Sequence, residues 1–129
     1  MIYIDSSVAL AHLLNEQRRF PDAVWNEQIV TSSRLLEYEV WNRLHAKGFA
    51  ASLARSARDF IEAIEFVDLT PRVLSRALMP FPLEVRTLDG LHLATADYLR
   101  SEGENIELAT YDARMLAVAR ALGIAIYAP

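Results

Sequence analysis

The chain has 129 residues, a length that suits one domain with its own hydrophobic core. Its 53% hydrophobic and 23% charged residues exclude disorder, and the absence of cysteine excludes disulfides, thiolate metal sites and cysteine nucleophiles. The net charge of −4 gives no indication of a generally basic nucleic-acid binder. With neither a signal-peptide pattern nor the roughly 20 apolar residues of a membrane span, we expect one soluble, cytoplasmic domain over residues 1–129.

Short apolar runs alternate with longer helix-like stretches along the chain. In the first half we expect a strand at 1–4, a helix from Ser6 or Ser7 to about 15, a short helix at 21–27, a strand at 29–31, a helix from Ser32 or Ser33 to about 47, a helix at 50–64 and a strand at 66–69. In the second half we expect a short helix after Thr70, a proline-rich loop at 79–83, a helix from 88 to 101 capped by Thr87, a strand at 106–109, a helix from Asp112 or Ala113 to about 122 and a strand at 124–127. This alternation is typical of a parallel sheet covered on both faces, with ligands at the carboxyl ends of the strands.

Acidic residues follow several of these predicted strands. Asp5 comes directly after the first strand and Asp112 shortly after the strand at 106–109, so both fall on the carboxyl edge of the sheet. Asp89 lies in the first turn of a helix, and Glu39 lies about one and a half turns into another. Crowded carboxylates repel one another until a divalent cation joins them, and oxygen ligands without cysteine favour Mg²⁺ or Mn²⁺. The pattern indicates metal-assisted hydrolysis of a phosphodiester.

Each of these acidic residues also has an ordinary structural interpretation. Asp5 can cap the first helix, and Asp89 and Asp112 can be favourable charges at helix N-termini, worth about 0.3–1 kcal/mol each. Glu39 can pair with Arg43 one turn further along its helix. Taken singly, all but Asp5 favour the structural interpretation, so the argument for a site depends on their coincidence at one edge.

Four segments carry a recognisable pattern: Ile2–Ser7, Thr31–Val40, Arg86–Ala96 and Ala109–Asp112. In order and spacing they resemble the PIN-domain ribonucleases, in particular the VapC-type toxins of bacterial toxin–antitoxin pairs, over essentially the whole chain. Helical periodicity alone does not distinguish Glu37 from Glu39 as the acid of this helix. The usual spacing of that family indicates Glu39. Gly90 departs from the family, where alanine is common, but near a helix N-terminus it leaves the arrangement of acids intact.

The resemblance implies a fold, an activity and a set of partners. The fold is an α/β/α sandwich around a parallel sheet of four to five strands, and the activity is that of an endoribonuclease dependent on Mg²⁺ or Mn²⁺. The partners are an RNA substrate, a cognate antitoxin protein and a second copy of the chain in a homodimer, with no membrane. The implied metal-binding and catalytic residues are Asp5, Glu39, Asp89 and Asp112, with Asp112 the loosest. Further candidates for lining the site are Ser6, Thr110, Arg86 and His92.

Other polar residues near these acids admit two interpretations. His92, three residues after Asp89, can act as a general base, although a histidine that packs beside the site or bonds to the backbone is the more common arrangement. Arg43, Arg86 and Arg114 can hold RNA phosphates, and the alternative for each is a surface salt bridge of little consequence. We favour the salt bridge slightly for Arg114.

Three aromatic residues, Trp25, Trp41 and Tyr38, can in principle stack on RNA bases. Aromatic side chains on amphipathic helices more often join the core or a dimer interface. We therefore expect core or interface roles for all three.

Three other functions compete with a toxin ribonuclease. A PIN-domain nuclease of RNA processing shares the fold and the chemistry, and the sequence hardly separates the two. A receiver domain or aspartyl phosphatase needs paired acids near the first strand and a late lysine, but Ser7 stands two residues after Asp5 and the only lysine is Lys47. A non-catalytic interaction module has no need of four acids at one edge.

Overall fold

The computed structural model describes all 129 residues and contains a single five-stranded parallel sheet. The strands are β1 (Ile2–Ile4), β2 (Val30–Ser33), β3 (Glu65–Val67), β4 (Glu107–Ala109) and β5 (Ala125–Ile126). Their order is β3-β2-β1-β4-β5, so the chain starts in the middle and adds strands first on one side and then on the other. The carboxyl end of β1 is therefore the point where the strand order reverses, which is where open parallel sheets bind ligands.

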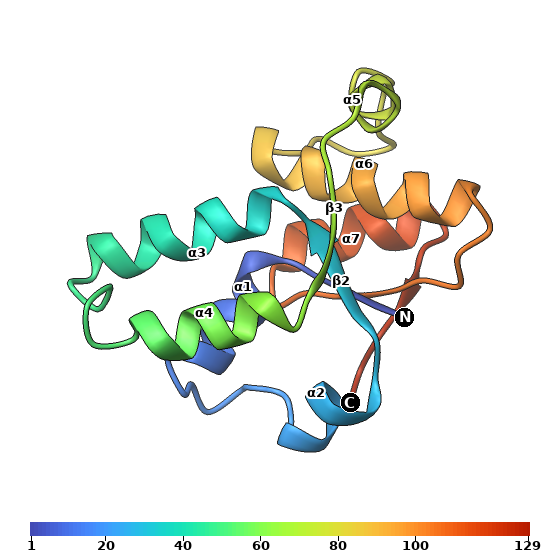
Figure 1. Cartoon of the computed structure of the whole chain (residues 1–129). Helices are drawn as coiled ribbons and strands as arrows, with labels where there is room; N and C mark the ends of the chain where they lie inside the picture. The colour runs from blue at the N-terminus through green and yellow to red at the C-terminus, as the bar shows by residue number, and fades with distance from the viewer.

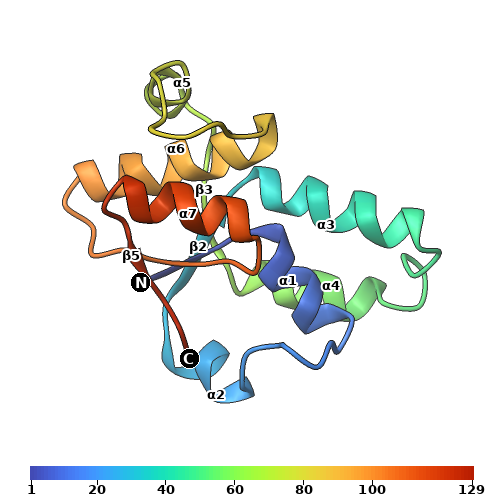
Figure 2. The same cartoon turned by 180° about the vertical axis from the view of Figure 1, so that it is seen from behind.

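Seven helices cover the sheet, as Figures 1 and 2 show from opposite sides. They are α1 (Ser6–Leu13), α2 (Asp22–Glu27), α3 (Leu35–Ala46), α4 (Ala54–Glu62), α5 (Pro71–Ala77), α6 (Thr87–Ser101) and α7 (Ala113–Ala121). Helices α1, α3 and α4 pack on one face and α6 and α7 on the other, with α5 on the outer side of α6. The predicted three-layer α/β/α sandwich is confirmed. None of the helices combines the length and apolar character that crossing a bilayer requires.

The strand β1 divides the core into two hydrophobic clusters. Ile2 and Ile4 face α1, α3 and α4, whereas Tyr3 faces α6 and α7, because side chains alternate along a strand. All three side chains are buried. The register pairs Ile4 of β1 with Ala109 of β4, so the residues that follow each strand leave the sheet side by side.

Several predicted helix starts are displaced in the structure. The N-cap of α1 is Asp5 and not one of the two serines that follow it, since its carboxylate accepts a hydrogen bond from Val8 N–H. Helix α6 follows Arg86 without a side-chain cap, where we expected Thr87 as the cap. Helix α3 has Arg34 at the N-cap position, and the expected Ser33 acts from one residue earlier, since its Oγ accepts from Leu35 N at 3.2 Å. Helix α4 begins at Ala54 and not at residue 50, because residues 51–53 form turns. These shifts are of a few residues and leave the topology unchanged.

An aromatic pocket encloses His12 of α1. Its ring lies 4.8 Å from that of Trp25 and 5.0 Å from that of Phe60. His12 Nδ1 and Trp25 Nε1 are both buried without a hydrogen-bond partner. Burial lowers the pKa of His12, while Asp22 opposes this shift and Arg19 adds to it.

The lowered pKa of His12 predicts a loss of stability in mild acid. The unfolded chain binds the proton near pH 6.5 and the folded chain resists it, so stability falls as the pH drops below about 6.5. His12→Phe keeps the ring stack and should flatten the change in the free energy of unfolding between pH 7 and pH 5, measured by urea denaturation. His45→Gln, which replaces an exposed histidine of α3, is the control and should keep the wild-type slope. An unchanged slope in His12→Phe would contradict the prediction.

Candidate active site

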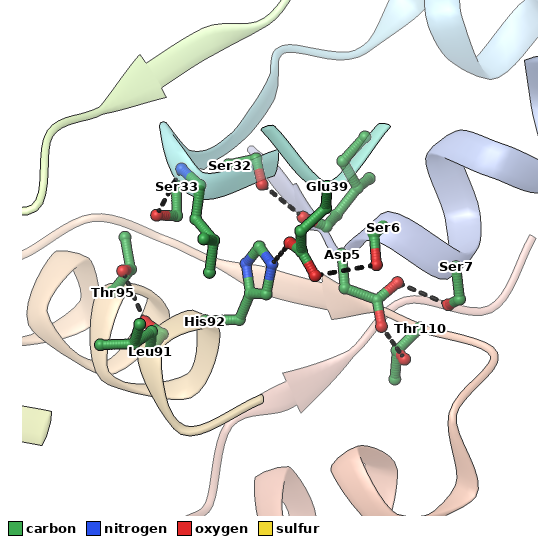
Figure 3. A network of polar contacts seen from close by, with 12 residues as sticks. Asp5, Ser6, Ser7, Ser32, Ser33, Glu39, Leu91, His92, Thr95 and Thr110 are labelled. Atoms are coloured by element: carbon green, nitrogen blue, oxygen red, sulfur yellow. Dashed lines mark hydrogen bonds and ion pairs between the residues drawn. The ribbon is translucent and has the colours of Figure 1, made fainter. Parts of the chain in front are cut away.

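Asp5 lies buried at the carboxyl end of β1, and hydrogen bonds hold both of its carboxylate oxygens. Oδ1 accepts from Val8 N at 3.2 Å. Figure 3 shows the other two bonds, from Ser7 Oγ to Oδ1 at 2.6 Å and from Thr110 Oγ1 to Oδ2 at 2.5 Å. Burial raises the pKa of Asp5, an effect that the bonds from Ser7 and Thr110 and the nearby His92 oppose. The carboxylate thus has a fixed orientation. Oδ1 already accepts two hydrogen bonds, whereas Oδ2 accepts one and keeps a lone pair for a further ligand.

The two hydroxyls that hold Asp5 also fasten the loop after β4. Ser7 Oγ accepts from Tyr111 N at 2.9 Å, and Thr110 Oγ1 accepts from Asp112 N at 3.0 Å. Asp112 is the N-cap of α7, where its Oδ1 accepts two backbone N–H groups of the first helical turn. The backbone of Asp112 is therefore linked to Asp5 through Thr110, and one of its carboxylate oxygens is already used as the helix cap.

Asp89 completes a group of three aspartates that come from three elements. It lies in the first turn of α6 and is partly buried. Burial raises its pKa, and the negative charges of Asp112 and Asp5 raise it further, while Arg86 and His92 oppose the shift. Asp89 thus lies within electrostatic reach of both Asp112 and Asp5.

Glu39 of α3 approaches the same edge from the other side. Its Oε2 accepts from Ser6 Oγ at 3.2 Å, and its Oε1 lies 2.5 Å from His92 Nε2 (Figure 3). Glu37 instead forms an exposed ion pair with Arg34 at 3.8 Å. The geometry thus distinguishes the two acids that helical periodicity left open and places Glu39 at the site. The alternative pair between Glu39 and Arg43 is not formed.

His92 is buried beneath the acids and connects them to the sheet. Only 1% of its surface is exposed, and its Nδ1 lies 2.8 Å from Tyr3 Oη. Tyr3 Oη accepts from Ser33 N at 3.1 Å, and burial raises the pKa of the phenol so that it stays protonated. The phenol is then free to donate to Nδ1, which assigns the other proton to Nε2 and directs it at Glu39. His92 packs beside the site, as expected, but it is fully and not partly buried, and its partners are side chains and not the backbone.

The four acids gather at one edge, but they do not form a closed set of metal ligands. No group of three or more histidine, aspartate or glutamate side chains is arranged to hold a metal ion. Glu39 is turned towards His92, and Asp112 is turned towards the backbone of α7. In chemical type the donors suit a hard cation, since they are carboxylates in a chain without cysteine.

Two cavities flank the acids. One of about 430 Å³ adjoins Asp89 and is lined by Arg86 and Arg114. The other, of about 340 Å³, adjoins Ser6 and Glu39 and is lined by Arg43 among other residues. None of these three arginines forms an ion pair, so the salt bridge that we favoured for Arg114 is absent.

The aromatic residues divide into two kinds. Trp25 and Trp41 pack against the core, as expected. Tyr38 does not: 64% of its surface is exposed, and its ring lines the cavity beside Glu39.

Sequence reasoning missed two residues of the network, Ser7 and Tyr3. Ser7 follows the strand-end Asp5 at a distance of two, the spacing at which a short hydroxyl side chain can bond back to a preceding carboxylate. Tyr3 gave no such signal, because its partner His92 stands 89 positions away in the chain.

Comparisons with known proteins agree with this arrangement. A family model described as PIN domain matches residues 2–121. Ribonuclease VapC46 of Mycobacterium tuberculosis is 37% identical over 131 residues, which span 99% of this chain and 97% of that protein. Ribonuclease VapC47 of the same species is 28% identical over 136 residues, spanning 100% and 97% of the two chains.

Two solved structures share the fold. VapC20 of Mycobacterium tuberculosis, a toxin that cleaves the sarcin-ricin loop, matches with a TM-score of 0.72 at 17% identity, and the match covers all of both chains. PAE2754 from Pyrobaculum aerophilum matches with a TM-score of 0.60 at 20% identity, covering 90% of this chain and 77% of the other. The family model and the full-length relatives carry the same conclusion as the fold: this chain belongs to the PIN-domain family, among its VapC-type members.

Proposed function

We propose that the protein is an endoribonuclease that depends on Mg²⁺ or Mn²⁺ and acts as the toxin of a toxin–antitoxin pair. The observation that carries the proposal is the convergence of Asp5, Glu39, Asp89 and Asp112 at the carboxyl edge of the sheet. The names of the full-length relatives, both ribonucleases of the VapC type, support the reaction and the toxin role. A cognate antitoxin protein and a second copy of the chain are the proposed protein partners.

The geometry suggests how the four acids would divide the work. Asp5 would be the central ligand, because hydrogen bonds fix its orientation before any ion arrives. Glu39 is oriented by Ser6 and His92, and Asp112 keeps only one oxygen free of its capping bonds, which suits the loosest ligand. When bound, the ion supplies a Lewis acid for the phosphoryl oxygen and an activated water as nucleophile.

The protein has a net charge of −4, and its proposed substrate, RNA, is also negatively charged, so local positive charge must attract the RNA to the site. The bound cation offsets part of the acidic group locally. Arg43, Arg86 and Arg114 flank that group and have no carboxylate partner, so their guanidinium groups are free for phosphates.

The direct test is cleavage of structured and unstructured RNAs by the purified protein. We expect discrete cuts with Mg²⁺ or Mn²⁺ and a rate at least about 10³-fold lower in EDTA, since the metal contributes several kcal/mol of transition-state stabilisation. Excess Mg²⁺ should restore the rate. Cleavage that is indifferent to chelation would refute the metal dependence, and no cleavage of any RNA would refute the ribonuclease itself.

A further inference from the structure

The cavity beside Asp89 has one wall from the loop before α6 and another from α7. The loop contributes residues 83–86, and α7 contributes Arg114, Met115, Ala117 and Val118. Its volume of about 430 Å³ lies within the range of roughly 300–1,000 Å³ that small-molecule sites occupy. Because Asp89 lines the cavity and Asp112 caps the turn of α7 that carries Arg114, the cavity opens directly beside two of the four acids.

The polar side chains of this cavity are not satisfied by the protein. Arg86 and Arg114 form no ion pair, and neither guanidinium makes a hydrogen bond within the chain. Glu84 is likewise unpaired. The two negative charges of Glu84 and Asp89 therefore balance the two positive charges of the arginines in the lining. Once a cation offsets Asp89, the two arginines leave the cavity with an excess of positive charge that suits a phosphate.

The cavity also has an apolar floor. Met115 and Val118 are buried beneath it, and Leu83 and Val85 form part of its wall. An apolar surface accepts the face of a nucleobase, and a carboxylate such as Glu84 can accept a hydrogen bond from a base amino group. The lining therefore combines what a nucleotide needs: a flat apolar contact, an acceptor for the base and arginines for the phosphate.

We propose that this cavity is the subsite for the nucleotide next to the phosphodiester that is cut, with its base against Leu83 and Val85 and its phosphate held by Arg86 and Arg114. The inference rests on the proposed ribonuclease function and adds where the substrate strand lies. An RNA with its reacting phosphate at the acids must place an adjoining nucleotide within one backbone step, and the cavity shares Asp89 with the acids. Free arginines in a cavity continuous with the acids favour RNA over a protein segment as its occupant.

The test measures RNA binding without cleavage. A fluorescent single-stranded RNA is titrated in Ca²⁺, used in place of Mg²⁺ to offset the acids, at several salt concentrations with the wild type, Arg86→Gln and Arg114→Gln. A gel of the same samples confirms that the RNA stays intact. Each variant should bind about tenfold more weakly, and its slope of log affinity against log salt should be smaller by about 0.7, the value for one lost phosphate contact on a single strand. Ala117→Phe, which adds a ring to the exposed side of the cavity without changing charge, should also weaken binding.

A matched control removes the same charge elsewhere. Arg58→Gln alters an exposed, unpaired arginine of α4, on the opposite face of the sheet, and should bind RNA as the wild type does. Melting temperatures establish that each variant is folded. Wild-type affinity and salt slope in Arg86→Gln, Arg114→Gln and Ala117→Phe would overturn the proposal and leave the cavity to a polypeptide partner; an equal loss in Arg58→Gln would overturn it as non-specific attraction.

The outcome is separable from that of the proposed function. Binding that depends on Arg86 and Arg114 in a protein that cuts no RNA would refute the ribonuclease and keep the subsite. If Arg86→Gln and Arg114→Gln bind RNA and cut it in the presence of metal as the wild type does, the ribonuclease function stands and the subsite is refuted.

Discussion

Asp5→Asn should abolish RNA cleavage, with a loss of at least about 10³-fold in rate, while the protein stays folded. The substitution keeps the shape of the side chain but removes the charge at the centre of the acidic group. It also replaces one of the two oxygens that accept from Ser7 and Thr110 with an amide that donates. The initial rate on a cleaved RNA in Mg²⁺ measures the effect, and a calorimetric Mn²⁺ titration of the same variant should show weaker metal binding.

A loss of activity in Asp5→Asn has meaning only if the fold survives. Burial raises the pKa of Asp5, so the charged form costs stability, and removing the charge offsets the loss of one hydrogen bond. We therefore expect a free energy of unfolding within about 1 kcal/mol of the wild type, a difference typical of such compensation. Asp59→Asn, at an exposed position of α4 without an ion pair, is the matched control and should cleave normally.

Cell growth provides a second readout for Asp5→Asn. Controlled expression of the wild type should arrest growth, and expression of the variant should not. Growth arrest by an Asp5→Asn protein that is folded but does not bind Mn²⁺ would contradict the proposed site. Cleavage of RNA in vitro by a wild type that does not arrest growth would favour RNA processing over a toxin role.

The sheet and the gathering of the acids could be predicted because both depend on local pattern. A short apolar run that ends in Asp5 must place that aspartate at the end of a strand, and parallel strands put all such ends on one edge. The same reasoning located Asp112, which lies three residues past β4. The likeness to PIN domains then distinguished Glu39 from Glu37, which periodicity alone did not.

The failures concern side-chain partners, which depend on contacts distant in sequence. His92 was expected beside the site or bonded to the backbone, and it does lie beside the site, but nothing local indicated its partners, Tyr3 of β1 and Glu39 of α3. Arg114 was expected in a salt bridge, but no carboxylate of another element reaches its guanidinium. The start of α1 depends instead on a local contact, since the carboxylate of Asp5, which we had named as a possible cap, accepts the N–H of Val8 in place of a serine hydroxyl.

His92 is expected to act as a positioning residue for Glu39, with a large effect on catalysis. The bonds from Ser33 N–H to Tyr3 Oη and from Tyr3 Oη to His92 hold the imidazole, whose Nε2–H then holds the Glu39 carboxylate. Groups that orient the ligands of a metal site typically change affinity or activity by about 10–100-fold when removed. We expect His92→Leu to lower kcat by about 100-fold, the upper end of that range, with little change in KM, because no part of His92 reaches the surface where RNA binds.

Substitutions at both ends of this network distinguish positioning from simple loss of stability. His92→Gln retains an N–H donor at the place of Nε2 and should recover most of the activity that His92→Leu loses, even though both disturb the bond to Tyr3. Tyr3→Phe removes the hydroxyl and should lower kcat by a smaller factor. Nitrogen-15 spectra of the metal-free wild type should show the imidazole protonated at Nε2. Equal losses in His92→Gln and His92→Leu, in proportion to their melting temperatures, would show that His92 only supports the core, because a residue that acts through its hydrogen bond to Glu39 must be replaceable by another donor.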